Sequence, residues 1–90
     1  MNHVNIIGQV SSEKKYNEDN TEITFHVVTS TSTVDYDGNS TSANQEHHII
    51  LKGRLANTTT KFLDKDIAIE GSLIYISGKA FIVANDYILL

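Results

Sequence analysis

Apolar side chains recur at every second position in five short segments, and this alternation constrains the fold more than any other feature of the chain. The segments are residues 4–10, 22–29, 46–53, 66–76 and 80–90. Successive side chains of a strand point to opposite faces, so a period of two predicts a strand with one face in the core. The five segments therefore predict an all-β protein.

The same alternation predicts which side chains form the core. In the fourth segment we expect Tyr75 to face inward together with the isoleucines at 67 and 69. Phe25 and Phe62 also occupy inward or packing positions and are assigned to the core. Gly8, in the middle of the first segment, indicates a bulge or a close approach of another backbone.

The connections between these segments complete the predicted topology. Leu55, Phe62 and Leu63 recur at helical spacing, which predicts a short helix between strands three and four, although the threonines at 58–60 are poor helix formers. Residues from about 30 to 45 are rich in Ser, Thr, Asn and Asp and are expected to form a long mobile loop. Five strands with a helix after the third is the order of the OB-fold, a Greek-key barrel.

Size and composition predict one domain covering residues 1–90. A chain of 90 residues buries a small core, and the absence of cysteine excludes disulfide support, so oligomerisation is the remaining common source of stability. No apolar stretch approaches the roughly 20 residues that a membrane helix needs, and the chain opens without a signal peptide. We therefore expect a cytoplasmic protein with no membrane partner.

Charge is unevenly distributed along the chain. The net charge of −4 disfavours a polyanionic partner, because the field of the whole molecule would repel it. Residues 47–63, however, contain no acidic side chain and include Lys52, Arg54 and Lys61. One stretch of an acidic molecule is thus suited to phosphate contacts.

The adjacent histidines in this stretch raise the question of a metal site. His47 and His48 point to opposite faces of a strand, so both rings cannot bind one ion without a bulge. The sequence has no cysteine and offers no clear carboxylate partner, so we expect neither a metal nor another cofactor. It also lacks a nucleophile elbow, a phosphate loop and paired carboxylates, which argues against an enzyme.

The residues themselves resemble those of one family along the whole chain. Five stretches, in the right order, are similar to the bacterial-type single-stranded DNA-binding proteins: MNHVNIIGQV, TEITFHVVT, EHHIILKGRLA, KFLDKDIAIEGSLI and VANDYILL. The chain looks like a short, tailless and diverged member. A second resemblance is to small primosomal replication proteins of the PriB type.

Departures from the family's pattern concentrate in the third strand. With Gly53 as the anchor, the family's tryptophan falls on Glu46, its arginine on His48 and its base-stacking phenylalanine on Lys52. The family histidine is retained as His47. The strand that would hold DNA has therefore lost its aromatic side chains.

The resemblance implies sequence-independent binding of single-stranded DNA in replication, recombination or mobile-element transfer. Such binding needs cations for phosphates and flat rings for bases. The candidates with these properties are Lys14, Lys15, Tyr16, Tyr36, His48, Lys52, Arg54 and Lys79. The ordinary alternative is that these cations form a solvated barrel face.

An oligomer is also implied, either a homodimer or a homotetramer. His47 is expected in the core or at an interface, and Ile74 and Ile76 fall near positions where the family often carries arginines. The candidate interface residues are Val4, Ile6, His47, Ile74 and Ile76. Replication or recombination proteins are further candidate partners.

A second function remains open. The acidity and the lost aromatics favour an OB-fold module for protein–protein interaction, or a primosome-type accessory, with weak or no affinity for DNA.

Overall fold

The computed structural model describes residues 2–90, and this part of the chain contains six strands and one short 3-10 helix. Their bounds are β1 Val4–Val10, β2 Lys15–Tyr16, β3 Glu22–Val34, β4 Ser40–Lys52, η1 Gly53–Ala56, β5 Asp66–Ile76 and β6 Lys79–Leu89. The predicted all-β class is confirmed. No helix in residues 2–90 is long and apolar enough to cross a membrane.

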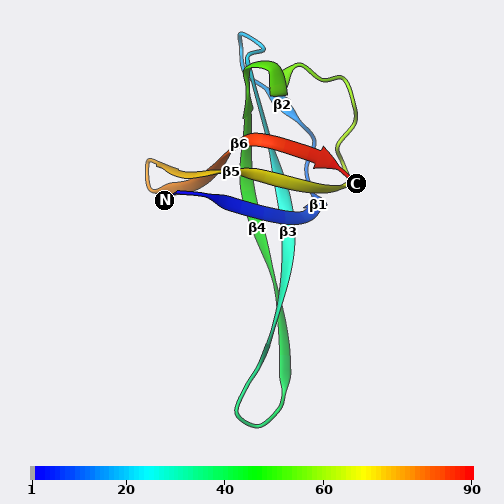
Figure 1. The fold of residues 1–90 in the computed structure, drawn as a ribbon, viewed down its shortest axis with the longest axis vertical. Helices are drawn as coiled ribbons and strands as arrows, with labels where there is room; N and C mark the ends of the chain where they lie inside the picture. Colours follow the sequence, from blue (N-terminus) through cyan, green and yellow to red (C-terminus); the bar gives the residue numbers. More distant parts are fainter. Residues whose placement is uncertain (1) are drawn as a thin grey trace.

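Five of the strands close into a barrel. The sheet order is β1-β5-β6-β4-β3-β2, and β1 also pairs with β3, which closes β1, β5, β6, β4 and β3 into a ring. All pairings are antiparallel except the short one between β4 and β6. This closed barrel is the predicted OB-fold, and β2 is an additional strand on the edge of β3 (Figure 1).

The barrel interior is filled mainly by branched aliphatic side chains and two aromatic rings. Phe25 and Phe62 are both buried, and their rings meet edge to face at a centroid distance of 5.3 Å. Their assignment to the core is confirmed. The assignment of Tyr75 is wrong, because 69% of its surface is exposed. β1 covers β5 only as far as Gly71, so the far end of β5 extends past the barrel.

The predicted helix between β4 and β5 is also wrong. Only the 3-10 turn η1 follows β4, and residues 57–65 contain no helix. Consecutive β-branched threonines at 58–60 lose rotamer freedom in a helix, which weakens it. Phe62 is still buried, so its apparent helical spacing reflects burial and not helix formation.

The segment expected to be a loop, residues 30–45, is instead a two-stranded ribbon that we call the arm. β3 and β4 pair without interruption from Glu22↔Lys52 to Val34↔Ser40, and residues 35–39 form the turn. The arm projects from the barrel as a long twisted hairpin (Figure 1). Sequence alternation misses it because both of its faces are exposed and polar, although its threonines favour strands.

Gly8 lies where the backbone of β3 closely approaches that of β1. A Cβ at this position would collide with the carbonyl oxygen of Val28 and the side chain of Val27 on β3. The predicted close approach is therefore confirmed. It occurs next to the two residue pairs that join β1 to β3 and close the barrel.

Replacing Gly8 by alanine should lower the free energy of unfolding by about 2–3 kcal/mol, because the added methyl group would clash with backbone atoms that cannot rotate away. Val34→Ala is the control, since Val34 is 71% exposed at the end of β3 in the arm. It should cost about 1 kcal/mol or less. Urea unfolding measures both, and equal losses would contradict the close-approach argument.

Candidate nucleic-acid interface

Three aromatic rings form a row across the outer face of three neighbouring strands. His26 on β3 and His48 on β4 are directly opposed, and their centroids lie 4.4 Å apart with the ring planes at 88°. The His48 ring lies 5.5 Å from that of Phe81 on β6. We call His26, His48 and Phe81 the ring row. All three side chains are partly exposed, so their surfaces are accessible from solvent.

The ring row lines a shallow groove on the barrel surface. Its other walls include Ser12 and Lys15 from the segment around β2, together with Glu13 and Thr24. Ile74 is the cross-strand partner of Phe81, so its side chain continues the same face onto β5. The groove thus combines the three rings and the apolar side chain of Ile74 with the ammonium group of Lys15 and the carboxylate of Glu13.

The pKa of His48, one of the groove residues, is shifted from its usual value. Burial lowers the pKa of the His48 imidazole from its usual 6.5, and the nearby His26 and Lys79 lower it further, whereas Glu46 opposes the shift. The His48 ring is therefore uncharged at neutral pH. Lys79 lies two residues before Phe81 on the same face of β6, which places a second cation beside the groove.

Two of the predicted DNA-binding residues, Lys14 and Tyr16, make contacts within the chain. The Lys14 ammonium donates to the carbonyl oxygens of Thr60 at 2.5 Å and Thr58 at 3.5 Å, and lies 4.7 Å from the centre of the Phe62 ring. The Tyr16 hydroxyl donates to the Thr58 carbonyl oxygen at 3.0 Å. These side chains satisfy carbonyl groups that a helix over residues 57–65 would have satisfied.

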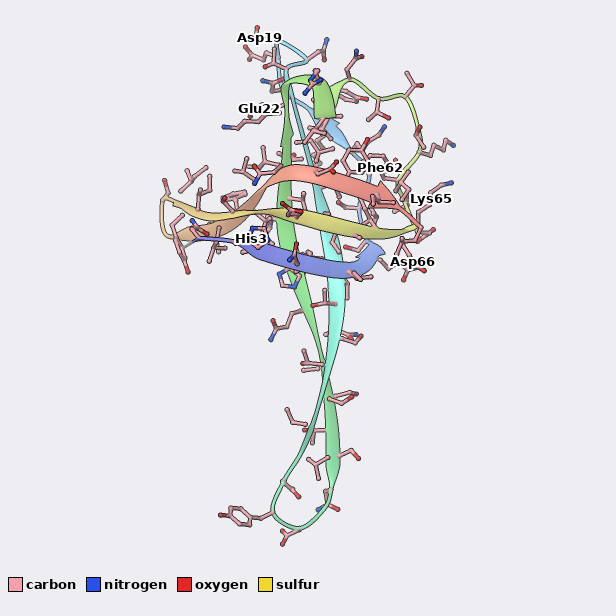
Figure 2. The ribbon with its side chains drawn as sticks, viewed as in Figure 1. His3, Asp19, Glu22, Phe62, Lys65 and Asp66 are labelled. Atoms are coloured by element: carbon pink, nitrogen blue, oxygen red, sulfur yellow. The ribbon has the colours of Figure 1, made fainter. Side chains whose placement is uncertain are left out.

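Other predicted residues are distributed over the molecule. Lys52 lies 3.7 Å from the carboxylate of Glu22, at the end of the molecule opposite the tip of the arm (Figure 2). Arg54 is exposed in η1. Tyr36 is fully exposed in the turn of the arm. The structure therefore brings together Lys15, His48 and Lys79, and separates them from Tyr36.

The predicted interface residues occupy different environments. Val4 and Ile6 pack against the core, while Ile7, the residue after Ile6, points outward. His47 is half-buried, and its Nε2 lies 2.8 Å from the Thr29 hydroxyl. Ile76 is 49% exposed near the β5–β6 turn.

Sequence reasoning missed His26 and Phe81. Alternation assigns His26 to the face opposite Phe25, but a lone histidine on that face carries no sign of function. Only the register between β3 and β4 sets it opposite His48. The same register places Glu46 beside His26, at 3.6 Å, and within 4.8 Å of His48, so the expectation that His48 has no clear carboxylate partner is wrong.

Comparison with known proteins identifies the fold. No protein-family model and no curated protein matches the sequence. A deletion mutant of the single-stranded DNA-binding protein from Thermus aquaticus superposes with a TM-score of 0.83 at 18% identity, covering all of this chain and 50% of the other. The chain thus spans half the length of that protein.

This chain covers nearly the whole length of two further solved structures. The single-stranded DNA-binding protein of Plasmodium falciparum, in complex with single-stranded DNA, gives a TM-score of 0.78 at 21% identity and is covered to 95%, with all of this chain matched. The dimeric N-terminal domain of PriB from Thermoanaerobacter tencongensis gives 0.64 at 17% identity, covering 99% of this chain and 96% of that one. At these identities the likeness establishes a shared fold.

The lowered pKa of His48 predicts a pH dependence of stability. The unfolded chain binds a proton at this ring more readily than the folded protein does. The free energy of unfolding should therefore decrease as the pH falls from 6.5 to the lower pKa of the folded state and past it. His48→Gln should reduce this decrease. Urea unfolding at a series of pH values, in buffer containing EDTA, measures it; identical pH profiles for the two proteins would contradict the prediction.

Proposed function

We propose that this protein binds single-stranded DNA without sequence preference, along the groove that contains the ring row. The observation that carries the proposal is the row itself: His26, His48 and Phe81 lie on three adjacent strands within stacking distance of one another. Bases of a single strand present flat faces that stack on such rings, whereas the bases of a duplex are already stacked. The groove therefore favours single strands over duplex DNA.

The surroundings of the row support the same function. Lys15 lines the groove and Lys79 lies near His48, so two cations border the path of a strand. Lys52 and Arg54 at the end of the barrel would extend the path. The three structures reported above have this fold, and two of them belong to single-stranded DNA-binding proteins.

Electrostatics limit the affinity that this groove can provide. The net charge is −4, Glu13 lines the groove and Glu46 lies beside His26. Few phosphate contacts and a repulsive overall field give weak binding that depends on salt. We propose that the protein acts on single strands during replication, recombination or mobile-element transfer.

A second candidate function, protein–protein interaction, is favoured by a different surface. Ile7, Ala68 and Ile88 are cross-strand neighbours on β1, β5 and β6, and they form an apolar row on the barrel. Ile7 and Ile88 are 68% and 63% exposed. In the described part of the chain, residues 4–8 also lack a strand partner on one edge of β1. We propose that this face joins copies of the chain into a dimer or tetramer.

The stacking role predicts the effect of removing one ring. Phe81→Leu keeps an apolar side chain on β6 but removes the flat surface, and should weaken binding to labelled oligo-dT roughly tenfold, within the range of about 1–3 kcal/mol per base known for OB-fold single-strand binders generally. Tyr75→Leu is the matched control, because Tyr75 is exposed at the far end of β5. It should leave affinity unchanged.

Fluorescence anisotropy at low salt measures both variants, with duplex DNA of the same length as a second ligand. Equal affinities for the two DNA forms would overturn the proposed single-strand preference. No binding of oligo-dT by the unaltered protein would leave protein–protein interaction as the function. An effect of Tyr75→Leu as large as that of Phe81→Leu would show that the ring row is not the binding surface.

The proposed oligomer predicts a light-scattering mass of two or four times the 10.0 kDa chain. The double variant Ile7→Asp, Ile88→Asp should dissociate it, because burying two carboxylates in an apolar contact is unfavourable. Ile76→Asp, which changes an exposed isoleucine away from this row, is the control and should retain the mass. A monomeric unaltered protein, or dissociation caused only by Ile76→Asp, would contradict the proposed face.

A further inference from the structure

Three side chains with metal-binding atoms converge on the outer face of β3 and β4. They are His26, Glu46 and His48, and their ligand atoms all lie within 4.8 Å of one another. The Nδ1 atom of His26 and the Oε1 atom of Glu46 are 3.6 Å apart. None of the three is fully buried, so an ion has access from solvent.

Strand register produces this convergence. His26 is directly opposite His48, and Glu46 is opposite Val28, two residues further along the same face. Side chains on one face of an antiparallel pair are neighbours both directly and diagonally. Because both strands belong to the closed barrel, their backbones hold the three side chains at a constant spacing.

We propose that His26, Glu46 and His48 bind a divalent transition-metal ion of the zinc class. Imidazole nitrogens and a carboxylate oxygen are usual zinc ligands. In a tetrahedral site with bonds of about 2.1 Å, ligand atoms lie about 3.4 Å apart. The separation of His26 from Glu46 already matches this value, and small rotations of the side chains bring in His48.

Three protein ligands leave one tetrahedral position open, as in zinc sites that take water or an external ligand. Here His26 and His48 also line the groove, so the ion would be accessible from it. This inference goes beyond DNA binding, because metal capture requires no nucleic acid.

Calorimetric titration of the metal-free protein with zinc chloride, with no DNA present, tests the site. One ion should bind per chain, and His48→Gln or His26→Gln should weaken binding at least tenfold, since losing a ligand costs no less than losing a supporting partner. His47→Gln and His3→Gln are matched controls that also remove one histidine, and should leave zinc binding unchanged. His47 is the chain neighbour of His48 but points to the other face.

Glu46→Gln provides a variant that does not threaten folding, because Glu46 is exposed. It should also weaken zinc binding at least tenfold. With cobalt in place of zinc, the unaltered protein should show the strong visible absorption of a tetrahedral site. Absence of saturable binding, binding that survives both His48→Gln and Glu46→Gln, or binding lost in His3→Gln would overturn the proposal.

Discussion

The contact between β1 and β3 at Gly8 is the constraint on which the rest of the structure depends. The barrel closes only where these strands pair, at Gln9↔Val28 and Val10↔Val27, and the missing Cβ of Gly8 allows the approach. Closure gives the sheet a sealed apolar interior and a continuous outer face. The ring row on that face crosses the β3–β4 hairpin and continues onto β6, the neighbour of β4 in the sheet. Closure therefore seals the inner side of the sheet, while the order β6-β4-β3 places the rings of the candidate site side by side.

Alternation predicted the five barrel strands and most of the core, because strand periodicity is recorded directly in the sequence. It could not predict the arm, whose two polar faces remove the apolar signal, and the spacing around Phe62 indicated a helix that the structure lacks, although Phe62 is buried as expected. The site was predictable in part. His48 and Lys15 were identified from the resemblance and from charge, whereas His26 and Phe81 become significant only through cross-strand neighbours. Register is a property of two strands, and a single strand's sequence does not reveal it.

The groove has two chemical properties in one small area. Its rings present flat surfaces, and its imidazole nitrogens, with the carboxylate of Glu46, present electron pairs. Both proposals use His26 and His48, so a bound ion would hold the rings on which a base would stack. An ion would also add positive charge to a face where Glu13 and Glu46 now offset the lysines. The groove therefore carries both acidic and basic side chains, unlike a uniformly basic groove.

The arm has a consequence for cooperativity. Its side chains are exposed on both faces, so residues 30–45 are held by the ladder hydrogen bonds between two strands and bury little apolar surface. A two-stranded ribbon without a core is marginally stable by itself. The tip can therefore open while the barrel stays folded, and the protection of amide hydrogens against exchange should decline along β3 and β4 from the barrel toward Tyr36. The barrel and the arm thus form separate cooperative units within one hairpin.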